Sequence, residues 1–146
     1  MDAITFLTTD HQAITSMFTK FQTLTDEYAQ AVAAEKICHR LSVHYTVEEE
    51  IFYPEARIVL DRIVGGMVDD FIAEHAQVKE LIATIKTMTT GEDLTSIMLE
   101  LKEISDLHME QEEVQMFPRL KEMGMEIIKL GREMSRRQIE LLSTVK

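Results

Sequence analysis

Apolar residues recur along this chain at steps of three and four, the spacing that places side chains on one face of an α-helix. Four long stretches follow this pattern. The first stripe is Ile4, Leu7, His11, Ile14, Phe18 and Phe21, and the second is Ala34, Ile37, Leu41, His44, Glu48, Ile51 and Glu55. The third is Val68, Phe71, Ile72, His75, Val78, Ile82 and Ile85, and the fourth is Leu94, Ile97, Leu101, Ile104, His108, Gln111 or Glu112, and Gln115 or Met116. A fifth, less regular stripe covers residues 127–145.

Turn-forming residues separate these stretches. The pattern predicts breaks near residues 25–26, 64–66, 90–92 and 123–124, where Thr, Asp and Gly interrupt the apolar periodicity. Short connections between long helices make neighbours antiparallel. The sequence therefore predicts an all-α fold: an antiparallel up-down four-helix bundle over about residues 2–122, with an additional C-terminal helix over about 125–145.

Composition narrows the class of protein. With 45% apolar and 28% charged residues the chain is typical of globular proteins. The formal net charge of −11 would repel a phosphate backbone, so we expect no nucleic-acid partner. Cys38 is the one cysteine, which excludes an intrachain disulfide and any Cys-rich metal site. The first residues lack the basic segment of a signal peptide, and no uncharged apolar stretch of about 18 residues occurs. We expect a cytoplasmic protein without a membrane partner.

Each of the four main stripes carries one histidine, and the chain repeats itself around these histidines. Asp10-His11 recurs as Glu74-His75, the segment from His44 to Glu49 recurs from His108 to Glu113, and Pro54 recurs as Pro118. The separation along the chain is the same in all three cases, and we call it the repeat offset. A repeat at a fixed offset indicates two copies of one structural unit. The two halves are therefore interpreted as copies of one helical hairpin.

Hairpin geometry predicts that these side chains meet. The midpoint between His11 and His44 is 27.5, and that between His75 and His108 is 91.5, both close to predicted turns, so each pair lies level in its hairpin. Residues four apart on a helix are offset by only about 40°, so Glu48 follows His44 on one face, and Glu112 follows His108 in the same way. The next residues, Glu49 and Glu113, are predicted to point well away from this interior.

Four imidazoles and two carboxylates at one level favour a metal site. Two buried carboxylates without counter-charge are costly, and either protonation or a metal relieves that cost. A pair of divalent ions would supply the missing charge. Mixed nitrogen and oxygen ligands suit iron or manganese better than calcium, and zinc also uses these ligand types. The Glu-x-x-His motif of ferritin-type bundles and the His-Glu-x-x-His motif of zinc proteases are absent. The alternative is a metal-free bundle whose polar core residues satisfy one another.

These motifs together closely resemble the hemerythrin-like (HHE cation-binding) domain family. The resemblance rests on Asp10-His11, on His44-x-x-x-Glu48-Glu49 running to Pro54, and on their counterparts in the second half of the chain. It covers residues 2 to about 120 and treats residues 1–146 as a single domain. It implies an oxo- or hydroxo-bridged pair of irons, with manganese or zinc less favoured, and with Glu48 and Glu112 as bridging ligands.

One departure from the oxygen-carrying members of that family bears on function. Where those proteins have a fifth histidine and an aspartate, this chain has Lys79 and Glu113. The implied ligand set is His11, His44, Glu48, His75, His108 and Glu112, as in the bacterial four-His, two-Glu groups. Fewer ligands leave open metal positions. The first hypothesis is a protein that binds or reduces O₂, peroxide or NO; whether it turns over and which redox partner it uses stay open. The alternative hypothesis is a non-enzymatic redox or iron sensor whose metal state controls its interaction with a partner.

The remaining polar residues receive less specific interpretations. Asp10 and Glu74 are either carboxylates that accept from the ligand imidazoles or solvated charges. Lys79 either donates to a bound anion or reaches solvent, and solvent is favoured. His39 is placed outside the inner ligand set, and Cys38 is interpreted as a small buried apolar residue. Tyr45 and Tyr53 are assigned to packing, the ten methionines to core filling rather than copper binding, and Pro54 and Pro118 to kinks or helix ends.

Overall fold

The computed structural model describes residues 1–88 and 92–143, with the side chain of residue 92 left aside, and every regular element in that part of the chain is helical. The first half contains α1 (Ala3–Gln22), α2 (Glu27–Val47), the π-helix η1 (Glu48–Phe52) and α3 (Tyr53–Leu60). The second contains α4 (Met67–Thr87), α5 (Glu92–Gln111), the π-helix η2 (Glu112–Met116) and α6 (Phe117–Glu122), and α7 (Ile128–Leu142) follows. The predicted break at 90–92 falls largely on residues 89–91, which lie outside the described residues.

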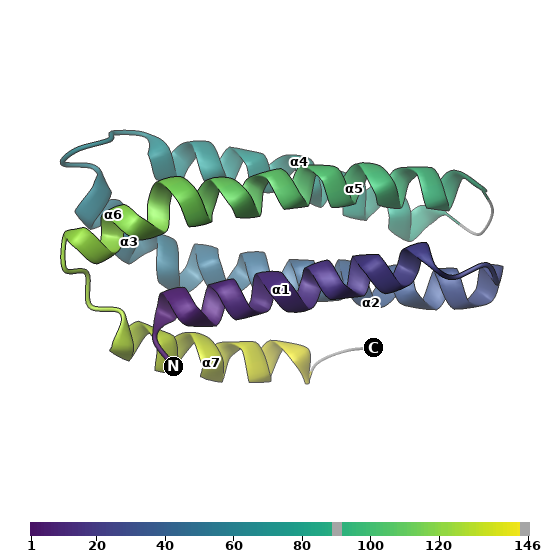
Figure 1. Ribbon diagram of the computed structural model, residues 1–146, viewed down its shortest axis with the longest axis horizontal. Coiled ribbons are helices and arrows are strands. Elements are labelled where there is room, and N and C mark those ends of the chain that lie inside the picture. Colours follow the sequence, from purple (N-terminus) through teal and green to yellow (C-terminus); the bar gives the residue numbers. More distant parts are fainter. Residues whose placement is uncertain (89–91, 144–146) are drawn as a thin grey trace.

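The four long helices form the predicted antiparallel bundle. Around the bundle α1 contacts α2, α2 contacts α4, α4 contacts α5, and α5 contacts α1. The helices run lengthwise beside one another, and α7 lies along the outside against α1 and α2 (Figure 1). The predicted fold class is confirmed. None of the helices in the described part of the chain has the length and apolarity needed to cross a bilayer.

Local chemistry explains where the helices begin. The side chains of Asp2 and Asp26 accept from backbone N–H groups in the first turns of α1 and α2, at 2.8 Å each, as N-capping residues do. Gly66, directly before α4, has a φ of 87°, which a residue with a Cβ rarely adopts. The breaks predicted near 25–26, 64–66 and 123–124 are therefore correct.

The two π-helices occupy equivalent positions in the repeat, and each precedes a proline. Proline lacks an N–H, and its ring clashes with the carbonyl four residues earlier in an α-helix. The wider turn, in which Tyr53 N–H donates to the Glu48 carbonyl, accommodates Pro54 in the first turn of α3. The helix thus changes its register at the proline and continues as α3.

This change of register corrects the predicted second stripe beyond Glu48. Glu55 is exposed, whereas Phe52, Tyr53 and Ala56 are buried. In an uninterrupted α-helix the side chains of residues 48 and 53 would lie about 140° apart. The π-turn instead brings both to the bundle interior.

The apolar core consists of two clusters at opposite ends of the polar histidine layer. One cluster includes Leu7, Val47 and Phe52 with residues of α3, α6 and α7, and the other includes Ile14 and Leu41 with residues of α4 and α5. Apolar packing on both sides limits the access of water to the layer between them. The polar layer is therefore held in a dry, fixed setting.

The C-terminal helix is fixed by close approach to the N-terminus of the chain. Ala3 N–H donates to the Ile127 carbonyl at 2.8 Å, and Met134 is fully buried. A Cβ added at Gly131 would collide with the Met1 carbonyl oxygen, so only glycine allows this contact. α7 is therefore an integral layer on α1 and α2.

Candidate metal centre

Six buried side chains converge in the middle of the bundle. One histidine comes from each of α1, α2, α4 and α5, and one glutamate begins each π-helix; the six are His11, His44, Glu48, His75, His108 and Glu112. Each is at most 3% exposed. The structure therefore brings together all six residues that the sequence predicted to meet, and it leaves His39 outside them.

The six donors form two groups that share both glutamates. The first group joins His11 and His44 to Glu48 and Glu112, and the second joins His75 and His108 to the same two carboxylates. Within each group the potential ligand atoms all lie within 4.8 Å of one another. Each carboxylate directs one oxygen to each group. Glu112 Oε1 is 3.2 Å from His11 Nε2, and its Oε2 is 3.6 Å from His108 Nε2.

Glu48 spans the groups in the same manner. Its Oε2 is 3.5 Å from His44 Nε2, and its Oε1 is 3.1 Å from His75 Nε2. Two carboxylates that each face both pairs of imidazoles give each group the donors that could hold a metal ion. Both glutamates are fully buried, so their carboxylates lie away from bulk solvent.

Unpartnered polar atoms mark the first group as suited to a cation. The Nε2 atoms of His11 and His44, Oε2 of Glu48 and Oε1 of Glu112 have no hydrogen-bond partner among the described residues. Buried polar atoms are normally paired, and leaving them unpaired costs free energy. Four such atoms facing one another, two nitrogens and two oxygens, fit a divalent transition metal.

Each imidazole is held from outside by a carboxylate on a neighbouring element. Asp10 accepts from Nδ1 of His44 at 2.8 Å, and Glu74 accepts from Nδ1 of His108 at 2.7 Å. This contact favours the first of the two interpretations of Asp10 and Glu74. A carboxylate on Nδ1 fixes the tautomer and the ring orientation, leaving Nε2 free for a metal.

Glu49 and Glu113 hold the other two imidazoles, which corrects the prediction that they point well away from the site. Glu49 accepts from Nδ1 of His75, and Glu113 accepts from Nδ1 of His11, at 2.6 Å in both cases. Each lies outside the inner cluster, but it reaches the histidine of the adjacent helix. The repeat carried a signal for this role, because the two glutamates are counterparts separated by the repeat offset.

Cations support two of these outer carboxylates. The Arg40 guanidinium donates to Asp10, with Nε at 3.0 Å, and Gln138 of α7 donates to the same oxygen at 3.2 Å. Lys79 Nζ lies 3.0 and 3.1 Å from the two oxygens of Glu49. Lys79 is half-exposed, as the sequence favoured, but its charge is directed to Glu49.

Charged neighbours shift the pKa values of several residues in the cluster. Burial opposes charge on His44, but Glu48 and Asp10 outweigh burial and raise the pKa of its imidazole to about 10. Burial likewise opposes charge on His108, and Glu112 raises its pKa to about 9. Burial would also raise the pKa of Glu112, yet the neighbouring imidazoles of His108 and His11 hold that pKa well below its usual value. The Glu112 carboxylate therefore stays ionised and can face a positive charge.

Tyr53 distinguishes the second group from the first. Its hydroxyl donates to Glu112 Oε2 and lies 3.3 Å from both Glu48 Oε1 and His75 Nε2. Burial and the charges of Glu112 and Glu48 raise the pKa of this phenol well above its usual range, so it acts as a neutral donor. The counterpart of Tyr53 in the repeat is Phe117, which stacks on His11 with ring centroids 6.2 Å apart. The assignment of Tyr53 to packing alone was therefore incomplete.

The other candidates behave as packing residues. Tyr45 stacks on His75 with ring centroids 3.9 Å apart, and its hydroxyl has no hydrogen-bond partner among the described residues. Cys38 is 2% exposed, and burial raises the pKa of its thiol to about 11. The interpretations of Tyr45 and Cys38 as buried packing residues are confirmed.

Comparison with known protein families gives a match over most of the chain. The family model of the hemerythrin HHE cation-binding domain matches residues 2–120 and matches again over 66–143. The start of the second match follows the start of the first by the repeat offset. A comparison with curated proteins found no match.

A solved structure shares the fold. The crystal structure of a hemerythrin HHE cation-binding domain-containing protein from Mycobacterium kansasii is similar to this chain, with a TM-score of 0.81. The two sequences are 18% identical, and the similarity covers 99% of this chain and 89% of the other. At 18% sequence identity this structural similarity is evidence for a shared fold alone.

Proposed function

The chain belongs to the hemerythrin HHE cation-binding domain family, and from that premise we propose that it holds two iron ions and binds or reduces a small oxidant such as O₂, peroxide or NO. The proposed ligands are His11, His44, Glu48, His75, His108 and Glu112. One observation carries the proposal: two groups of four buried donors share the same two carboxylates. We further propose that residues 1–146 form a single domain, because α7 shares the core of α1 and α2.

The donor set supports a redox-active transition metal. Each group offers imidazole nitrogens and carboxylate oxygens in equal number. This mixture suits iron or manganese, and also zinc, better than calcium, which prefers oxygen ligands alone. When bound, a pair of irons would supply one-electron redox steps and open positions for a small molecule. Six inner residues leave such positions open, because they offer four imidazole nitrogens and two shared carboxylates.

The protein residues set the conditions for that chemistry. Glu48 and Glu112 place carboxylate oxygens at the centre, and the four outer carboxylates orient the imidazoles. Phe52 and Phe117 pack beside the cluster with ring centroids 5.7 Å apart and exclude water from that side. The Tyr53 hydroxyl offers a proton donor at the second group alone.

Metal analysis of the purified chain tests the proposal first. We expect two irons per chain in wild-type protein, and loss of most bound iron in Glu48→Gln and Glu112→Gln. Glu55→Gln is the matched control, because Glu55 lies on the same helical segment but is exposed. A wild-type chain that binds no metal, or a Glu55→Gln loss equal to that of Glu48→Gln, would show that the buried glutamates are not ligands.

Reaction with oxidants tests the second half of the proposal. The iron-loaded protein is reduced without oxygen and mixed separately with O₂, hydrogen peroxide and NO in a stopped-flow spectrometer. We expect a spectral change with at least one of them, and repeated cycles with excess reductant would distinguish reduction of the oxidant from binding. A reduced protein whose spectrum changes with none of the three would contradict the proposed ligand class.

A further inference from the structure

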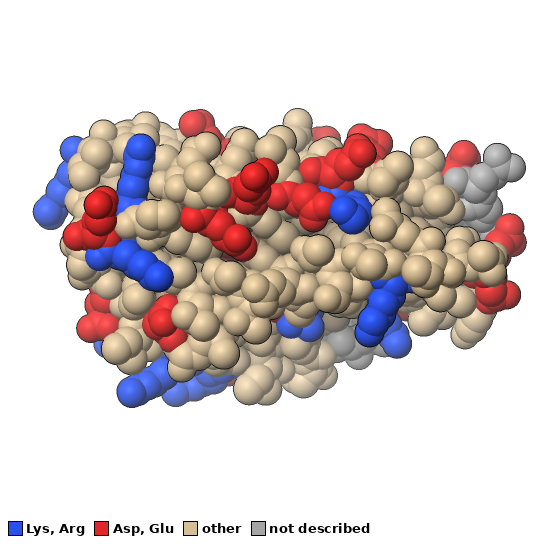
Figure 2. All heavy atoms as spheres, in the orientation of Figure 1, with Lys and Arg blue, Asp and Glu red and all other residues tan. Residues whose placement is uncertain are grey.

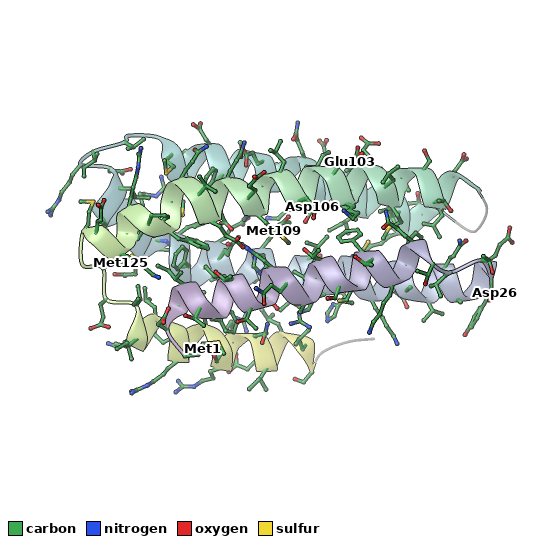
Figure 3. All side chains as sticks on the ribbon, in the orientation of Figure 1. Met1, Asp26, Glu103, Asp106, Met109 and Met125 are labelled. Atoms are coloured by element: carbon green, nitrogen blue, oxygen red, sulfur yellow. The ribbon has the colours of Figure 1, made fainter. Side chains whose placement is uncertain are left out.

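The internal repeat makes two seams between neighbouring helices of the bundle equivalent, and one of them has an acidic lining that includes a histidine of the inner cluster. The repeat offset relates the seam between α1 and α5 to the seam between α4 and α2. A surface depression of about 580 Å³ lies along the α1/α5 seam, and His11 forms part of its lining. Asp106 and Met109 lie on this face of the molecule (Figure 3).

Carboxylates dominate the charge of this depression. Asp106, Glu110 and Glu113 line it, and its lining contains no lysine or arginine from the described part of the chain. Lys102 pairs with Asp106 at 2.6 Å, whereas no described residue pairs with Glu110. Acidic side chains gather over α5 on the same face (Figure 2). The seam therefore has a local negative potential that attracts cations.

Two adjacent glutamates connect this surface with the interior. Glu113 is 39% exposed at the depression and accepts from His11 Nδ1, while Glu112 is fully buried and faces His11 Nε2 at 3.2 Å. His11 is itself only 3% exposed, and its Nε2 has no hydrogen-bond partner among the described residues. One imidazole thus separates an exposed carboxylate from a buried one.

The equivalent seam is closed by different residues. Lys79, the counterpart of Thr15, binds both oxygens of Glu49 and neutralises the counterpart of Glu113. Tyr45 replaces Met109 and stacks on His75. Thr46 stands where the first seam has Glu110. At these positions the α2/α4 seam therefore carries less negative charge and covers its histidine.

We propose that the α1/α5 depression is the site at which a divalent metal ion first binds and from which it enters the centre, passing from Glu113 to Glu112 by way of His11. This inference rests on the proposed function, in which the inner donors hold metal. The negative charge of the seam raises the local concentration of cations, and steering of this kind changes association rates by roughly 10- to 1,000-fold. Loading thus begins at the His11/His44 group.

The rate of metal uptake tests the route. Cobalt(II) is mixed with the full chain after chelation and dialysis, and its absorption is followed in a stopped-flow spectrometer. Thr15→Lys places the counterpart of Lys79 beside Glu113 and should slow uptake about tenfold. Thr19→Lys is its control, because it adds the same charge one helical turn away at another exposed threonine.

A second pair of variants removes charge instead of adding it. Glu110→Gln should slow uptake a few-fold and weaken its salt dependence, whereas Glu103→Gln, an exposed position on the same helix, should keep the wild-type rate. All four variants should reach the same final stoichiometry as wild-type protein, which shows that they fold and retain the centre.

The outcomes separate the two proposals. Wild-type uptake rates in Thr15→Lys and Glu110→Gln, or equal slowing in the controls, would overturn the route and leave the metal centre intact. A wild-type chain that takes up no cobalt and no iron would overturn the proposed function and the route together.

Discussion

Removing one hydroxyl from the second donor group should destabilise the protein measurably. The substitution Tyr53→Phe deletes the hydroxyl that donates to Glu112 and lies 3.3 Å from Glu48 Oε1, while the ring, which is 1% exposed, keeps its packing. A hydrogen bond to a charged group contributes about 1.5–3 kcal/mol. For a chain of this length each kcal/mol shifts the melting temperature by about 2–4 °C. We therefore expect the melting temperature of the chelated protein to fall by about 3–12 °C.

Tyr45→Phe provides the matched control. Tyr45 is fully buried beside His75, but its hydroxyl has no hydrogen-bond partner among the described residues. Deleting an unpaired buried hydroxyl is close to neutral or stabilising. Thermal unfolding followed by circular dichroism, with a chelator present, compares the two variants with wild-type protein. If Tyr53→Phe were as stable as Tyr45→Phe, the hydrogen bonds of Tyr53 to the carboxylates would contribute nothing, and the reasoning would be refuted.

Three further substitutions or modifications probe other parts of the molecule. Asp10→Asn should weaken metal affinity about 10- to 100-fold, because His44 loses the carboxylate that orients its ring. Competition with a chromogenic chelator measures this affinity. An equal loss in Asp70→Asn, a substitution at an exposed aspartate, would contradict the prediction. Gly131→Ala should lower the free energy of unfolding by about 1–3 kcal/mol, because the new Cβ would collide with the Met1 carbonyl. Urea denaturation measures this change. Unchanged stability would show that α7 moves freely relative to the N-terminus. In the folded protein at pH 8, Cys38 should react with iodoacetamide at least about a hundredfold more slowly than in urea-unfolded protein, because its raised pKa leaves little thiolate and burial blocks access. The reaction rate should increase as the pH approaches 11. Equal rates in the folded and unfolded states would contradict the burial of the thiol.

Much of the centre could be predicted from spacing within one chain. A histidine in each apolar stripe, a glutamate four residues beyond two of them, and the internal repeat predicted which six side chains meet. Helical periodicity fixes which face a side chain occupies, and hairpin geometry fixes its level. These are local rules, so they held for the long helices. They failed at Glu55, where a proline converts the preceding turn into a π-helix and changes the register.

The sequence by itself determined the bundle and its ring of inner donors, because both depend on periodicity along single helices. Only the tertiary structure decided how that ring is supported, since contacts between helices depend on side-chain reach and not on spacing. Glu49 and Glu113 point off their own helix face, yet each reaches the histidine of the neighbouring helix. The asymmetry between the halves, with Lys79 closing one seam and Thr15 leaving the other open, likewise exists only where distant segments pack together.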